Sequence, residues 1–210
     1  MDESAEDGQR ENGIAQGIRG KFSELTQYLA VTGANKIIRR YFAMNAFDGA
    51  MTSLGVVMGS WLGNITDPRS TIGVIITSGV AMMVSGFSGT YMTESAERNH
   101  SLNELEDAML VDLDDTIYGQ AGKFVSLFAA FVDGSAPFLA SIPAVIPFLL
   151  VPSLLAIRAA YIISAAACMI SLFALGVYLA TISGENLLVS GIKMVISGIA
   201  VAIIALLLGH

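Results

Sequence analysis

Charged residues divide this chain into long apolar stretches and short polar ones. Asp, Glu, Lys and Arg are absent from residues 70–93 and 159–184, and three more stretches each contain a single charge: 41–66, 124–157 and 186–210. A helix needs about 20 mostly apolar residues to cross a bilayer. The pattern therefore predicts five transmembrane helices, at about 41–63, 71–92, 123–150, 157–183 and 187–208.

The overall composition agrees with this pattern. Hydrophobic residues make up 54% of the 210 residues, charged residues only 14%, and the mean hydropathy is +0.65. A soluble domain carries about 25% charged residues. We therefore expect an all-α, multi-pass integral membrane protein, with the lipid bilayer as its main partner.

The third predicted span contains three prolines: Pro137, Pro143 and Pro147. Proline kinks or breaks a helix because it removes a backbone hydrogen bond. A single kinked helix is the preferred interpretation, and two short re-entrant segments are the alternative.

The polar stretches predict the remaining organisation. Residues 1–13 are acidic and poor in apolar side chains, so we expect a disordered tail. Residues 14–40 form a basic leader with apolar residues at helical spacing. An amphipathic helix on the membrane surface is expected there, with a helix docked on the bundle as the alternative. An acidic segment, 93–122, separates the first two spans (41–92) from the last three (123–210).

The acidic segment contains a signal for the start of a helix. In "SLNE", Ser101 takes the N-cap position and Glu104 follows three residues later, which is a capping box. We therefore predict a separate helix at 102–116, after a bend near His100.

Basic residues indicate the orientation. Six of the 11 Lys and Arg residues precede the first span, with Lys36, Arg39 and Arg40 directly beside it. The positive-inside rule places the N-terminus in the cytoplasm, and five spans then place the C-terminus outside. Arg158 falls on the outside, against the rule. A prokaryotic plasma membrane is the expected location, with the acidic segment inside the cell.

Asp48 is the first candidate functional residue, because a carboxylate at membrane depth costs a few kcal/mol. Its neighbours one helical turn away are Met44, Asn45, Met51 and Thr52. Carboxylate, thioether, amide and hydroxyl groups together suit a transition metal such as Fe²⁺ or Mn²⁺ better than Mg²⁺. The alternatives are a carboxylate hydrogen-bonded between helices and methionines that only pack.

Asp133 is the second carboxylate at membrane depth. Pro137, four residues later, frees the backbone carbonyl of Asp133, which could bind a cation. A ligand role and a structural pairing both remain open, and the positions along the two spans allow Asp48 and Asp133 to meet.

Acidic residues past the second span are the third feature. Glu94, Glu97, Glu104 and Asp107 lie at the predicted cytoplasmic end of the bundle. Carboxylates attract divalent cations, so these residues are candidates for collecting metal ions. A solvated helix face is the alternative.

Other chemistry is poorly supported. The only cysteine is Cys168, and the two histidines are far apart, so neither a thiolate nor a histidine metal site is expected. Asp48 and Gly49 also occur as a pair in CDP-alcohol phosphotransferases, but the Ala-Arg pair and later aspartates of that motif are missing. We expect no enzymatic activity, no organic cofactor and no nucleic-acid partner.

The order of these features resembles the vacuolar iron transporter family. "AFDGAMTSLGVVMGSW" is similar to that family's Asp-Gly-containing first helix. "SGFSGTYMTES" resembles its second helix, in which Ser85, Gly89 and Tyr91 match. "FVDGSAPF" resembles its third helix loosely. The similarity covers most of residues 36–210.

The resemblance implies a five-span homodimer that exchanges divalent metal for protons, with Asp48 as a transport-site residue. The chain departs from the family pattern at two positions: Gly86 stands where the family has a metal-binding methionine, and Thr90 where it has a glutamate. Asp133, Met51 or Met83 are candidates to replace those groups. The function expected from sequence is therefore Fe²⁺ or Mn²⁺ export, and the alternative is a transporter-like membrane protein with another cargo or a regulatory role.

Overall fold

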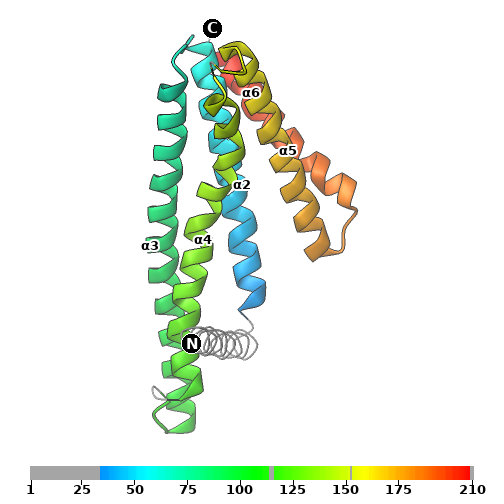
Figure 1. Ribbon diagram of the computed structural model, residues 1–210. Helices are drawn as coiled ribbons and strands as arrows, with labels where there is room; N and C mark the ends of the chain where they lie inside the picture. The colour runs from blue at the N-terminus through cyan, green and yellow to red at the C-terminus, as the bar shows by residue number, and fades with distance from the viewer. Residues whose placement is uncertain (1–33, 114–115, 152, 209–210) are drawn as a thin grey trace, which may run out of the picture.

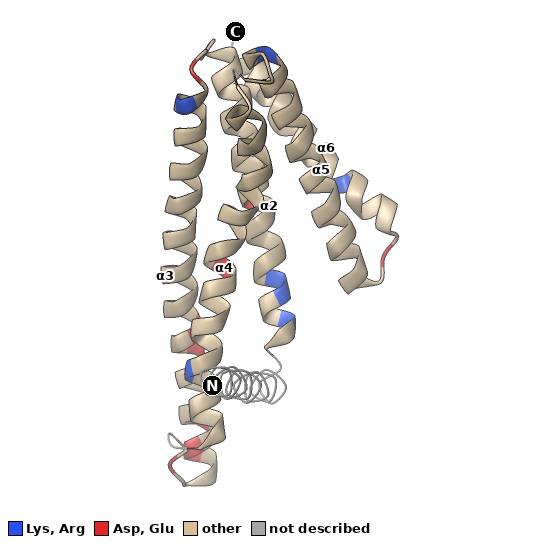
Figure 2. Ribbon diagram, in the orientation of Figure 1, with Lys and Arg blue, Asp and Glu red and all other residues tan. Residues whose placement is uncertain are grey.

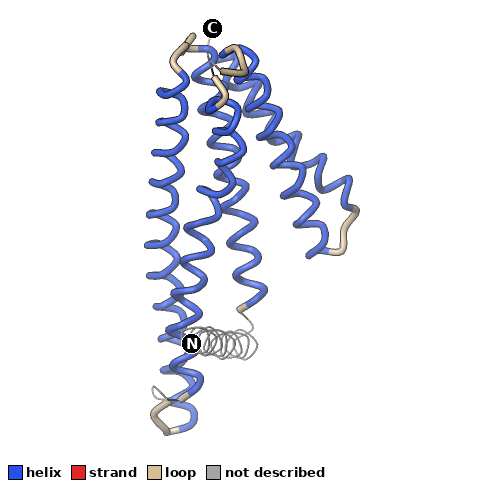
Figure 3. The backbone as a smooth tube through the Cα atoms, viewed as in Figure 1, coloured by secondary structure: helices blue, strands red, loops and turns tan. Residues whose placement is uncertain are grey.

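A computed structural model describes residues 34–113, 116–151 and 153–208. Regular structure in these ranges is entirely helical: α2 (Asn35–Leu62), α3 (Pro68–Met109), α4 (Ile117–Leu149), α5 (Ile157–Ser183) and α6 (Leu187–Leu208) (Figures 1 and 3). The all-α prediction is confirmed. The acidic tail at 1–13 and most of the leader at 14–40 lie outside the described residues.

In the part of the chain that the structure describes, four helices, α3 to α6, are long and apolar enough to cross a membrane, as expected for a multi-pass membrane protein. The ends of α5 and α6 agree with the predicted spans 157–183 and 187–208. α2 is not among the four, because its first turns are basic and Asn45 and Asp48 lie within its apolar part.

α2 occupies the middle of the arrangement and contacts each of the other four helices. α3 packs mainly along α4, while the α5–α6 hairpin packs on α2 and diverges from it toward the hairpin turn (Figure 1). The main core lies between α2, α4 and α5 and includes Leu54, Val57, Phe148, Tyr161 and Leu172. Outward-facing apolar side chains cover much of the surface, as in a bundle surrounded by lipid.

The predicted bend near His100 is wrong. α3 continues without interruption from Pro68 to Met109 (Figure 3), so 102–116 is not a separate helix. No Gly or Pro lies between Thr90 and Met109, and the His100 and Glu104 side chains pair across one helical turn at 3.5 Å. The local cap signal at Ser101 therefore does not outweigh the continuing helix.

The single-helix interpretation of the third span is confirmed, because α4 contains all three prolines in one helix.

The connection before α3 is a tight turn. Asp67 caps α3 by accepting hydrogen bonds from the Ser70 hydroxyl (2.9 Å) and the Arg69 N–H (3.1 Å). These hydrogen bonds, chiefly the one from Ser70, lower the pKa of Asp67.

Candidate functional site

Asp48 lies on an open face of α2. Met44 and Thr52, one turn before and one turn after it, are exposed on the same face. Within the described residues, Asp48 takes part in no hydrogen bond or ion pair. Met51, also predicted to join this group, is half-buried and packs against the main core. The predicted ligand face therefore retains Asp48, Met44 and Thr52.

Asp133, in contrast, is 3% exposed and has partners on two other helices. Thr90 of α3 donates a hydroxyl hydrogen bond to Oδ2 of Asp133 at 2.6 Å. The Asn45 side-chain amide of α2 donates to Oδ1. A hydrogen bond to a charged group contributes about 1.5–3 kcal/mol. The hydrogen-bonded group Asn45, Asp133 and Thr90, the Asp133 clasp, therefore holds α2, α3 and α4 together at membrane depth.

Asp48 and Asp133 lie near each other. Asn45, one helical turn before Asp48 on α2, donates to Asp133, so Asp133 lies within about one helical turn of Asp48, although only Asp133 is enclosed. Figure 2 shows the contrast with the rest of the bundle, where charged residues gather at the helix ends and connections. The structure thus brings together the two carboxylates at membrane depth and provides intrachain partners for one of them.

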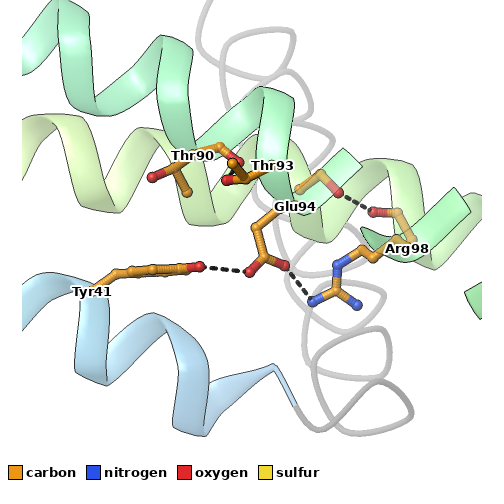
Figure 4. Close-up of polar contacts among 7 residues, drawn as sticks. Tyr41, Thr90, Thr93, Glu94 and Arg98 are labelled. Carbon is orange, nitrogen blue, oxygen red and sulfur yellow. Dashed lines mark hydrogen bonds and ion pairs between the residues drawn. The ribbon is translucent and has the colours of Figure 1, made fainter. Parts of the chain in front are cut away.

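A second polar cluster lies further toward the N-terminal end of α2. Tyr41 donates its hydroxyl to Glu94 Oε1 at 2.9 Å, and Arg98 pairs with Glu94 Oε2 at 3.2 Å (Figure 4). Glu94 is only 8% exposed. Because both of its oxygens are engaged, Glu94 fastens α2 to α3 as well as bordering the polar end of the bundle.

The other predicted acidic residues lie along the C-terminal part of α3. Glu97, Glu104 and Asp107 are exposed, and Glu104 faces His100. Asp48 is seven residues beyond Tyr41 on α2, or about 10 Å along the helix axis. Glu104 is ten residues from Glu94 in the opposite direction, about 15 Å. The structure does not bring these acids to Asp48.

The described part of the chain contains no cluster of three or more His, Cys, Asp or Glu residues that could hold a metal ion. Among the described residues of one chain, the groups near Asp48 include the Met44 thioether, the Thr52 hydroxyl and the Asp133 carboxylate. A divalent cation at Asp48 would need further ligands from water or another chain.

Two polar contacts between helices are not predicted by the sequence. Thr90 enters the sequence argument only as a departure from a family pattern, and Tyr41 does not enter it. A signal was present: Thr90 and Glu94 are four residues apart on α3, and Tyr41 and Asn45 are four residues apart on α2. Such pairs place polar groups on one face of each helix, although they do not say which faces meet.

No family model matches the chain, and no solved structure matches it. The uncharacterized protein MJ0645 of the archaeon Methanocaldococcus jannaschii is 28% identical over 172 residues, which cover 80% of this chain and 87% of that protein. The similarity therefore extends along most of both chains.

Proposed function

We propose that this protein is a dimeric transporter that exports a divalent transition metal, Fe²⁺ or Mn²⁺, from the cytoplasm in exchange for protons. The observation that carries the proposal is Asp48, an exposed carboxylate in the apolar part of α2 that has no hydrogen-bond or ion-pair partner among the described residues. A charged side chain facing lipid is unfavourable by a few kcal/mol. A water-filled path and a cation remove that cost.

The open face of α2 supports the dimer. Gly55 and Gly59 continue this face beyond Thr52, and a Cβ added at either glycine would meet nothing within 4 Å. Small residues allow close helix approach in a membrane. Two copies packed through this face would bring together two Asp48 carboxylates with methionine and threonine ligands, the set that one chain lacks.

α2 then acts as the fifth span. It lies among the four apolar helices and contacts all of them, so the low hydropathy of its sequence is offset by protein neighbours. Lys36, Arg39 and Arg40 at its start support a cytoplasmic N-terminus by the positive-inside rule, and five spans would then put the C-terminus outside.

The chain departs from the pattern of the vacuolar iron transporter family at Gly86 and Thr90, and both residues lie beside Asp133. Thr90 donates to Asp133, and a Cβ added at Gly86 would lie 3.2 Å from the same carboxylate oxygen. A carboxylate from α4 therefore stands beside the position at which the family has a glutamate. We assign Asp133 as its replacement, supplying the second negative charge near Asp48.

Proton exchange follows from carboxylate chemistry. An apolar environment favours the protonated acid, and a divalent cation favours the ionised form. In the proposed exchange, a divalent cation and protons compete for the carboxylates of the site, so metal transport in one direction is coupled to proton transport in the other. Glu97 and the more distant Glu104 and Asp107 collect metal ions at the cytoplasmic end, while Glu94 holds α2 to α3.

A second candidate function is a transporter-like membrane protein with another cargo or a regulatory role. The Asp133 clasp favours it, because both carboxylate oxygens already accept intrachain hydrogen bonds. Such a carboxylate is less available to a metal ion than Asp48.

Calorimetry with Mn²⁺ and Fe²⁺ on the detergent-purified protein separates the two functions. Metal transport predicts saturable binding that releases protons, detected as a dependence of the binding heat on buffer ionisation enthalpy. Absence of saturable binding by wild-type protein would favour the second function.

A further inference from the structure

A cavity of about 360 Å³ lies where the polar end of α3 meets the first turns of α4. Its apolar lining comes from Ile37, Leu102, Leu105 and Tyr118, and its charged lining from Glu94, Glu97, Arg98 and Lys123. Leu105 and Tyr118 are 38% and 56% exposed. The cavity is thus a partly apolar groove at an otherwise polar end of the molecule.

Lipid does not account for this groove. The uncharged part of α3 ends at Thr93, and Leu105 is twelve residues further on, about 18 Å along the helix axis. That distance places Leu105 well beyond the uncharged part of α3, among charged side chains. A protein segment with apolar side chains fits this lining better than lipid does.

A buried polar atom beside the groove also lacks a partner. Arg98 uses its Nη2 for Glu94, but its buried Nε has no hydrogen-bond acceptor among the described residues. A buried donor without an acceptor is unfavourable, because it has lost its hydrogen bond to water. The occupant of the groove should therefore carry an acceptor as well as apolar side chains.

The described chain begins beside this groove. Ala34 is fully buried against Val125 and Ala129 of α4, and Ile37, one turn later, is part of the groove lining. The residues that precede Ala34 therefore start within reach of Leu102 and Leu105.

The sequence before Ala34 has the chemistry that the groove requires. Residues 14–33 carry an apolar stripe at helical spacing: Ile14, Ile18, Phe22, Leu25 and Leu29. Arg19 and Lys21 can face the exposed carboxylates of Glu97 and Glu104, and Glu24 and the backbone carbonyls supply acceptors for Arg98.

We infer that residues 14–33 of the same chain dock in the groove between α3 and α4, with their apolar stripe on Leu102, Leu105 and Tyr118. This docking does not involve Asp48, although it would pair Arg19 and Lys21 with two of the acids proposed to collect metal ions. It ties the start of α2 to the polar end of the bundle, where Glu94 and Arg98 join α2 to α3.

Crosslinking in nanodiscs tests the docking with the full-length protein. Cys168 is first replaced by alanine, and F22C or L25C is combined with L105C. Equal amounts of ¹⁴N- and ¹⁵N-labelled protein are mixed in detergent before reconstitution and treated with a bifunctional maleimide. Mass spectrometry is expected to find crosslinked peptides in which both halves carry the same isotope. The yield should be well above that of a control pair in which I146C, at the far end of α4, replaces L105C.

Crosslinks of mixed isotope would overturn the inference by showing that a second copy fills the groove. A crosslinking yield equal to that of the I146C control pair would also overturn the inference, because residues 14–33 would then lie on the membrane surface or in solvent.

A second measurement does not depend on cysteine variants. Leu105→Asp changes a partly exposed side chain and should leave the bundle folded. It is expected to speed tryptic cleavage after Arg19 and Lys21 about tenfold, because cleavage follows the undocked population. Met109→Asp, at an exposed apolar position outside the groove, is the matched control and should leave the rate unchanged. Equal rates for the two variants and the wild type would contradict docking.

Discussion

Asp48→Asn is expected to lower Mn²⁺ or Fe²⁺ flux in proteoliposomes by about 30-fold or more while leaving the protein folded. The substitution keeps the size of the side chain and removes its charge. Losing one partner of a desolvated charge pair costs about 2–5 kcal/mol, and each 1.4 kcal/mol corresponds to a factor of ten. Asp48 has no intrachain partner among the described residues, so the stability of the bundle should not change.

The matched control is Asp67→Asn. Asp67 is an exposed carboxylate in the turn before α3, where asparagine is also a good N-cap. The metal flux of the Asp67→Asn variant should therefore equal that of the wild type. Size-exclusion chromatography of both variants verifies that they assemble normally. Wild-type flux in a correctly assembled Asp48→Asn variant would eliminate the proposed mechanism.

Gly49→Ala is expected to destabilise the protein by about 3 kcal/mol or more, at the upper end of the effect of overpacking a core. A Cβ at Gly49 would lie 2.5 Å from Pro137 Cα and would also meet the Pro137 carbonyl oxygen. These are backbone atoms of α4, so no side chain can move aside and the two helices must separate. Unfolding in detergent, followed by circular dichroism, measures the loss.

Gly73→Ala is the control, because an added Cβ at this α3 glycine meets nothing within 4 Å. Alanine has the higher helix propensity, so this variant should be as stable as the wild type or slightly more so. If both variants unfolded alike, the close approach of α2 and α4 would be wrong.

The absence of charge along the chain was enough to predict most of the fold. The predicted ends of the last two spans coincide with α5 and α6, because lipid excludes charged side chains and the loops carry them. The length of α3 was not predicted. The cap signal at Ser101 is local, whereas the helix is maintained by a run of residues without glycine or proline and by contacts along α4.

The candidate site was predictable only in part. The cost of a carboxylate in an apolar helix singled out Asp48 and Asp133, since that argument needs no knowledge of neighbours. Their different surroundings depend on which helix faces meet. Sequence spacing places Asn45 near Asp48 along α2, but only the packing of three helices directs Asn45 and Thr90 to Asp133.

The most direct test of the central claim is to locate bound Mn²⁺ by anomalous X-ray scattering in crystals of the purified protein. The account predicts an anomalous peak within coordination distance of two Asp48 carboxylates, one from each copy of a dimer in which the two α2 helices face each other. Manganese bound only near Glu97, Glu104 and Asp107, with no peak at Asp48 under saturating Mn²⁺, would contradict it.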